Sequence, residues 1–355
     1  MNIIIISLIP SYNRQGRDLY SYLRTRGLTP WLLQYDCKDD RGRRQLGVHY
    51  IKPRGIFSKF YVLRHVLCGF LRVLTCRGDV AVAINQVSLW VGVLCRVFLG
   101  CRVVYYSLEY SRPSQLMRLL MRYCVNAYID VEENRMQKFM RECRATLPSY
   151  VINNMPMHEA GKVSGGLLKS FLERTIPSLS DRKVVIYAGS FQSYAQLPLI
   201  IAAVEGLSKQ LVLVLMTYNL PDGLKEKLPG NVVVAPCVAN GFYHWLSDAD
   251  LALLPYEDAF DFNVLNCSPQ KLFDCYACGV PYLASNRPLI RKTLAIYPAA
   301  GRLVDFSNKQ MISSALLESI NMKTDRCSSR MKALFDQRFH YEAQADCWQS
   351  VLACM

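Results

Sequence analysis

Short apolar segments alternate with amphipathic helical patterns along the first half of this 355-residue chain. The predicted strands span residues 3–9, 31–35, 80–85, 102–106 and 127–131, and the predicted helices span residues 17–26, 88–98 and 115–125. Connections that pass through a helix bring successive strands into parallel pairs, with helices on both faces of the sheet. The alternation therefore predicts an α/β fold with a doubly wound parallel sheet.

The alternation breaks once and then restarts. Prolines and glycines interrupt it between residues 148 and 180, at Pro148, Pro156, Gly161, Gly165, Gly166 and Pro177. Further strands are predicted at 184–188, 211–216, 231–235, 251–255 and 281–284, with helices at 198–207, 241–247 and 271–278. We therefore predict two Rossmann-like domains, 1–155 and 183–335, with a linker at 156–182 and a closing helix within 336–355. Ligands of such sheets bind at the carboxyl ends of strands, so the site is expected in a cleft between the halves.

Positive charge is concentrated in the first half of the chain. Lysines and arginines number 42 and aspartates and glutamates 28, for a net charge of +14. Residues 1–150 hold 23 basic and 10 acidic side chains, whereas residues 151–355 hold 19 and 18. This excess indicates an anionic partner, which can be nucleic acid, a phosphorylated small molecule or an anionic membrane. Because 51% of the residues are apolar, a disordered chain is excluded.

Fourteen cysteines occur at no regular spacing, many of them inside apolar segments. This usage predicts small buried thiols in a reducing cytosol. The pair Cys275 and Cys278 has no second pair or histidines at ligand spacing, so a packed helix is predicted there rather than a metal site. The N-terminal apolar residues lack a preceding positive charge and predict a strand rather than a signal peptide. No uncharged apolar stretch reaches the ~18 residues of a membrane span.

The segment NCSPQKLFDCYACGVP, residues 266–281, carries the strongest functional pattern. Ser268 and Pro269 suit the N-cap and first turn of a helix. Free amides at that helix end, with Lys271 one turn in, predict a site for a diphosphate. Asp274 lies farther along the helix and can bind a ribose diol through two charge-assisted hydrogen bonds. The alternative is a capped amphipathic helix in which Lys271 and Asp274 are incidental.

Two other segments lie upstream of this one. In VVIYAGS, Gly189 and Ser190 follow a predicted strand, and glycine allows the backbone to approach an anion closely. An ordinary strand-to-helix turn is the alternative. The segment DADLALLPY contains a DxD motif. Asp248 lies in a loop and Asp250 leads directly into a strand, so this motif does not predict a metal site.

In this order and spacing, YAGS, DADLALLP and SPQKLFDCYACGVP resemble the motifs of the GT-B glycosyltransferases, specifically family 4 (group 1). The resemblance covers the whole chain. The segment VINNMP at residues 151–156 is similar to the start of that family's interdomain linker, and residues 339–352 resemble a closing helix that crosses back to the first domain. The resemblance implies a first domain that binds an acceptor and a second that binds a nucleotide-sugar donor.

For the donor, the resemblance implies that Gly189 and Ser190 border the phosphates. Lys271, together with Cys267 and Ser268, would hold the diphosphate. The basic pair that the family carries after the glycine turn is absent here. Lys271 is therefore expected to bear more of the phosphate charge.

Two donor positions depart from the family's pattern. Asp274 takes the place of the ribose-binding glutamate and is shorter by one methylene. Asn266 stands where the family often has a glutamate that contacts the donor sugar. An asparagine can donate and accept hydrogen bonds but carries no charge, so the identity of the sugar stays open.

Acceptor-side candidates lie in the first domain. Glu109 follows the predicted strand 102–106, and it can act as a base or orient the acceptor. The alternative is a solvated loop glutamate. The loop after the first strand adds Tyr12, Asn13, Arg14 and Gly16, but it has no GxGxxG and so no dinucleotide fingerprint.

Residues 56–77 predict a helix with apolar and basic side chains. One face is formed by Phe57, Phe60, Leu63, Leu67 and Leu71, and the basic residues off that face are Lys59, Arg64, Arg72 and Arg77. This arrangement suits a helix lying in an anionic membrane interface, and a core helix with solvated charges is the alternative. Nucleic acid is not expected as a partner, because no helix-turn-helix, zinc or RNA-recognition signature is present.

Together these patterns predict a bacterial-type glycosyltransferase that needs no cofactor or metal. It would be cytoplasmic and peripheral to the inner face of the cell membrane. It would transfer a sugar from a nucleotide-diphosphate donor to a lipid-linked glycan of a surface polysaccharide such as O-antigen, capsule or exopolysaccharide, with retention of configuration implied by the resemblance. The alternatives are another GT-B sugar-nucleotide enzyme, such as a hydrolysing epimerase, and a basic nucleic-acid-binding or scaffold protein without activity.

Overall fold

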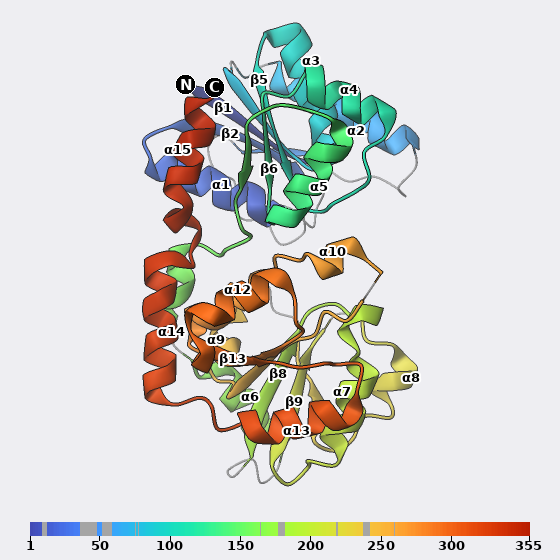
Figure 1. Cartoon of the computed structure of the whole chain (residues 1–355), viewed down its shortest axis with the longest axis vertical. Coiled ribbons are helices and arrows are strands. Elements are labelled where there is room, and N and C mark those ends of the chain that lie inside the picture. Colours follow the sequence, from blue (N-terminus) through green and yellow to red (C-terminus); the bar gives the residue numbers. More distant parts are fainter. Residues whose placement is uncertain are drawn as a thin grey trace. The chain divides into compact units, whose positions relative to one another are not determined.

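The computed structural model describes residues 1–8, 13–35, 48–51, 59–74, 76, 78–163, 165–176, 182–217, 219–236, 242–258 and 260–355. The chain forms two compact units (Figure 1). The first unit comprises Met1–Asn154 and Gln344–Met355, and the second comprises Met155–Ala343. The predicted linker, 156–182, therefore lies within the second unit, where it includes the helices η3 (His158–Lys162) and α6 (Leu167–Thr175).

The first unit contains a parallel sheet with the strand order β3-β2-β1-β4-β5-β6-β7. Its strands are β1 (Asn2–Ser7), β2 (Thr29–Tyr35), β3 (Val48–Ile51), β4 (Val80–Ile84), β5 (Arg102–Ser107), β6 (Ala127–Asp130) and β7 (Ser149–Val151). Its helices are α1 (Asn13–Thr25), α2 (Lys59–Val73), α3 (Gln86–Leu99), α4 (Gln115–Tyr123), α5 (Glu133–Cys143) and α15 (Ala345–Ala353). Figure 1 shows α1 and α15 on one face of this sheet and α3 and α5 on the other.

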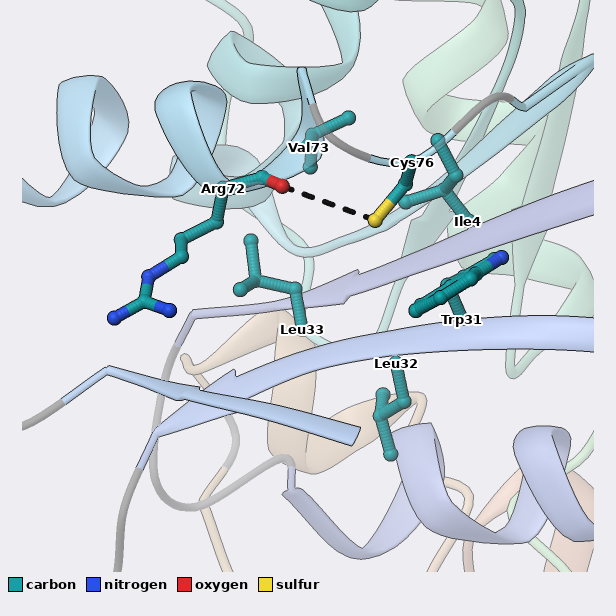
Figure 2. Close-up of a pocket in the computed structure, with 7 residues that line it drawn as sticks. All are labelled: Ile4, Trp31, Leu32, Leu33, Arg72, Val73 and Cys76. Carbon is teal, nitrogen blue, oxygen red and sulfur yellow. Dashed lines mark hydrogen bonds between the residues drawn. The ribbon is translucent and has the colours of Figure 1, made fainter. Parts of the chain in front are cut away.

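Helices on both faces explain why the central strands are apolar without alternation. Every residue of β4 is buried, and so is every residue of β1 after Asn2. Ile4 and Ile6 pack in one cluster with residues of α2 and α3. Beneath the end of α2, a small hollow is lined by Ile4, Trp31, Leu32, Leu33, Arg72, Val73 and Cys76 (Figure 2).

The C-terminal helix α15 belongs to the first unit. Trp348 is buried there, with its ring 6.4 Å from that of Tyr22 and 6.0 Å from that of Tyr106. The amide of Asn153 donates to Oε1 of Gln344 at 2.7 Å and ties the start of α15 to the end of β7. The predicted closing segment begins at residue 336, whereas the structure assigns the chain to the first unit again only from Gln344.

The second unit contains a parallel sheet with the order β10-β9-β8-β11-β12-β13. Its strands are β8 (Lys183–Ala188), β9 (Leu211–Met216), β10 (Val232–Val234), β11 (Leu251–Leu254), β12 (Tyr282–Ala284) and β13 (Gly301–Leu303). Its remaining helical segments are η4 (Ser193–Ala195), α7 (Leu197–Glu205), α8 (Asp222–Lys225), α9 (Phe242–Leu246), α10 (Phe262–Leu265), α11 (Gln270–Cys278), α12 (Pro288–Ile296), η5 (Pro298–Ala300), α13 (Lys309–Ser319) and α14 (Asp325–Arg338), and η6 (Tyr341–Gln344) spans the boundary between the units. Two buried clusters, one with α11 and α14 and one with α7 and α13, cover the two faces of the sheet. The prediction of two α/β domains with parallel sheets is confirmed.

Within the described ranges, we find no helix that is both long and apolar enough to cross a membrane.

Candidate functional site

Three elements of the second unit meet at one edge of its sheet. Strands β8 and β11 are parallel neighbours, in a register that pairs Val185 with Leu251. Their carboxyl ends therefore lie at the same edge, where Gly189 follows β8 and Tyr256 follows β11. The first turn of α11 brings Lys271 to this edge, and a small hollow beside it is lined by Ile186, Ala188, Phe242, Leu246, Ala252, Leu253, Leu254, Lys271 and Cys275.

Lys271 presents a half-buried cation beside two aromatic rings. Its Nζ lies 5.1 Å from the centroid of the Tyr187 ring and 5.6 Å from that of the Tyr256 ring. Burial lowers the pKa of Lys271 to about 8, although the nearby carboxylate of Asp274 acts in the opposite direction. Within the described part of the chain, Nζ makes no hydrogen bond or ion pair. An anionic ligand would pair with this cation directly.

Gly189 leaves room for this cation. A Cβ built on Gly189 would overlap Nζ of Lys271 and would lie 3.0 Å from the hydroxyl of Tyr187. That hydroxyl donates to the carbonyl of Ser190 at 2.7 Å, so Tyr187 fixes the turn after β8 as well as one side of the cation. The predicted neighbours Gly189 and Lys271 are therefore brought together.

The first turn of α11 differs from the prediction. Pro269, with φ −74° and ψ 119°, occupies the N-cap, and no side chain caps the helix. The assignment of Ser268 as N-cap is wrong, because the amide of Leu272 bonds to the carbonyl of Pro269 and closes the first turn one residue later. Ser268 itself is buried. The first turn of α11, which carries Lys271, still has amides without intrahelical partners and the positive end of the helix dipole.

The other predicted donor residues lie on or just before α11. Asp274, 3% exposed, is one turn after Lys271 and accepts a hydrogen bond from the hydroxyl of Tyr243 at 3.0 Å from Oδ1. Asn266 is buried at the end of α10, and its side-chain amide donates to the carbonyl of Phe262 at 3.2 Å. Cys267 is half-buried and close enough to Lys271 to affect its pKa.

A polar network behind Tyr256 was not predicted. Glu257 accepts from the hydroxyl of Ser285 at 2.6 Å and from the amide of Phe306 at 3.2 Å, and it pairs with Arg287 at 3.2 Å. Nε of Arg287 also donates to the carbonyl of Tyr256 at 2.7 Å. This network holds the loop after β11 in place, so that the Tyr256 ring stays beside Lys271.

The two aspartates of the DxD motif have structural partners. Asp248 accepts hydrogen bonds from the amides of Gly166, Leu168 and Lys169 and thereby caps α6. Asp250 accepts from the amide of Val184 at 2.8 Å. No group of three or more metal-binding side chains occurs among the residues that the structure describes.

The predicted acceptor residues belong to the first unit. Glu109 is exposed in the segment after β5. Arg14 forms an ion pair with Asp18 at 3.6 Å. Gly16 is buried, and an added Cβ would lie 3.1 Å from that of Ser7, so this glycine lets α1 pack closely on β1. Tyr12 lies outside the described residues, as does the side chain of Asn13, the first residue of α1.

Comparison with solved structures identifies the fold. The chain is similar to a glycosyltransferase from Rickettsia africae, with a TM-score of 0.74 at 10% identity over 99% of this chain and 98% of that one. It is equally similar to HepE (Alr3699) of Anabaena, crystallised with UDP, with a TM-score of 0.74 at 14% identity over the full length of both chains. A Listeria monocytogenes protein described as a UDP-N-acetylglucosamine 2-epimerase matches with a TM-score of 0.67 at 11% identity, over 99% of this chain and 95% of that one.

These likenesses define the class of fold. The chain has the two-domain α/β architecture of the GT-B glycosyltransferases over its whole length. No family model and no curated protein matches the sequence.

Proposed function

We propose that this protein is a glycosyltransferase that binds a nucleotide-diphosphate sugar at the edge of the second sheet. The observation that carries the proposal is the cation of Lys271, whose pKa is lowered by burial and whose Nζ makes no direct ion pair in the described residues, although the Asp274 carboxylate is nearby. A diphosphate is negatively charged and would pair with the ammonium of Lys271. The amides at the start of α11 would donate hydrogen bonds to its oxygens. HepE, a protein of the same fold, has been crystallised with UDP and with UDP-glucose.

The other residues of the edge take roles that follow from their chemistry. Gly189 and Ser190 would border the phosphates, with Cys267 and Ser268 on the side of α11. The buried carboxylate of Asp274 would accept hydrogen bonds from the ribose, beside the hydroxyl of Tyr243. Asn266 would contact the donor sugar through its amide.

The reaction would pass the sugar to an acceptor hydroxyl. The bond between the anomeric carbon and the diphosphate oxygen breaks, the acceptor oxygen forms the new bond, and its proton goes to a base. Glu109, exposed after β5, is our candidate for that base or for orienting the acceptor. The leaving diphosphate would stay paired with Lys271.

The remaining details of the proposal rest on the sequence resemblance. They are a family 4 type of hexosyl transfer, retention of configuration and independence of metal. They also include a lipid-linked glycan acceptor in surface polysaccharide synthesis, and a cytoplasmic protein peripheral to the membrane. The excess of basic residues in the first half of the chain supports an anionic acceptor or surface.

A hydrolysing epimerase is the second candidate, and the match to the Listeria protein favours it. Both activities require nucleotide-diphosphate binding at the same edge. Only a transferase attaches the sugar to a separate acceptor, so product analysis separates the two.

Binding of UDP and GDP, measured by calorimetry, tests the donor site. We expect Lys271→Ala to raise the dissociation constant by about tenfold or more, because it removes a charge-assisted contact to phosphate. Lys309→Ala, an exposed lysine of α13 in the same unit, is the matched control and should leave the affinity unchanged. Equal affinities for the wild type and Lys271→Ala would refute the phosphate role.

A further inference from the structure

Helix α2 is apolar on two opposite faces. Val66, Gly69 and Val73 are buried against the first sheet and α3. On the other side of the helix, the exposed fractions are 56% for Leu63, 49% for Leu67 and 63% for Leu71. Packing within the unit therefore buries the apolar residues of one face and leaves those of the other face exposed.

Helix α3 extends this exposed surface. It packs against α2, and the rings of Phe70 and Phe98 lie 5.4 Å apart at the contact. Phe98 is nevertheless 66% exposed and the adjacent Val97 is 65% exposed. We define the α2–α3 surface by its exposed apolar side chains, which are Leu63, Leu67, Leu71, Leu74, Trp90, Val97 and Phe98. Exposed large apolar side chains gathered on two packed helices indicate contact with a partner or a membrane.

The charges of these two helices are all of one sign. Neither α2 nor α3 contains an aspartate or glutamate, whereas they carry Lys59, Arg64, Arg72 and Arg96. Arg72 is exposed in the last turn of α2. Arg96 is held in place by a hydrogen bond of 2.7 Å to Oδ1 of Asn126. A partner for this surface must therefore combine apolar groups with negative charge.

We infer that the α2–α3 surface docks onto an anionic lipid bilayer. A bilayer offers acyl chains to the leucines and phenylalanine, and its acidic headgroups attract the net positive charge of the two helices. A second copy of this chain fits less well, because its own α2–α3 surface would oppose positive charge with positive charge. The inference extends the predicted interfacial helix to a second helix. It rests on the membrane association in the proposed function and names the surface that would make it. Its failure would leave the proposed donor site untouched, because all of these residues belong to the first unit.

Vesicle sedimentation of the full chain tests this inference. The probes are vesicles of phosphatidylcholine alone and vesicles in which about a third of the lipid is phosphatidylglycerol. We expect the wild type to bind the anionic vesicles, and the double variant Leu67→Glu/Phe98→Glu to bind them about tenfold less or weaker still. Leu317→Glu, at a leucine of the second unit that is 44% exposed, is the matched control and should bind like the wild type.

Charge and assembly provide the second arm of the test. Arg72→Gln should reduce binding to anionic vesicles by about fivefold, and added salt should weaken the binding of the wild type. Circular dichroism of each variant establishes that it is folded. The inference is overturned if the folded double variant binds the vesicles as the wild type does. It is also overturned if the wild type binds no anionic vesicles, and a dimer that the double variant abolishes would then assign the surface to a second copy of the chain.

Discussion

The ammonium of Lys271 lies over the ring of Tyr187, with 5.1 Å between Nζ and the ring centroid. The hydroxyl of the same tyrosine holds the carbonyl of Ser190 at 2.7 Å. Tyr187 thus connects the turn after β8 with the cation from α11. The predictions for the donor site follow from this connection.

The affinity for UDP should depend on pH through Lys271. Burial lowers the pKa of this group to about 8, so that it loses its proton and its attraction for phosphate as the pH rises through that value. The dissociation constant of the wild type should rise between about pH 7 and about pH 9, and binding near pH 8 should take up a proton, because the bound anion favours the charged form. Calorimetry in buffers of different ionisation enthalpy measures both. The same proton uptake in Lys271→Met would contradict the assignment.

Replacing Gly189 with alanine should weaken nucleotide binding without unfolding the protein. The new methyl group would overlap Nζ of Lys271 and displace that flexible side chain from its place beside the rings. We expect a loss of affinity of about tenfold. Gly206→Ala is the control, because a Cβ at Gly206 meets no atom within 4 Å and its φ of −68° suits alanine. Wild-type affinity in Gly189→Ala would show that the phosphates bind elsewhere.

The role of Asp274 can be tested with a nucleotide that lacks the ribose diol. A 2′,3′-dideoxy analogue of UDP should bind the wild type about tenfold more weakly than UDP, because the diol contact to a buried carboxylate is missing. In Asp274→Asn, UDP itself should bind more weakly and the difference between the two ligands should shrink. A difference as large as in the wild type would remove the ribose assignment. Tyr243→Phe shows how much of the effect comes from the hydrogen bond to Asp274.

Asp248 should matter for stability and not for binding. Its carboxylate caps α6 through the amides of Gly166, Leu168 and Lys169. Asp248→Ala should lower the free energy of unfolding by about 1–2 kcal/mol in urea titrations and leave the UDP affinity unchanged. A loss of metal-dependent nucleotide binding in this variant would instead assign the DxD motif to a metal.

Local patterns predicted much of the fold and part of the site. The apolar runs of β8 and β11 predicted the strands, and the glycine after β8 and the lysine of α11 followed from motif spacing. The network of Glu257, Ser285 and Arg287 was missed because these residues are separated along the chain, and only the sheet order brings them together. Tyr187 was also missed as a site residue. Its position close to the carboxyl end of a predicted strand was the sequence signal that could have indicated it.

Helix α2 shows a different limit of sequence analysis. Its apolar residues occupy two faces, so periodicity alone could not distinguish a membrane-facing helix from a core helix. The structure shows one buried face, as a core helix would have, and one exposed apolar face, for which membrane contact stays a prediction. The contribution of α3 to the exposed surface depends on the packing of Phe70 against Phe98, which joins residues of two helices.

Product analysis tests the central claim most directly. The protein is incubated with nucleotide-diphosphate sugars and membranes that contain lipid-linked glycans, and the lipid extract and free nucleotides are examined by mass spectrometry. The proposed function predicts that each nucleotide diphosphate released is matched by one sugar added to an acceptor, and that Lys271→Ala slows both. Release of nucleotide diphosphate together with a free, epimerised sugar and no glycosylated acceptor would contradict it.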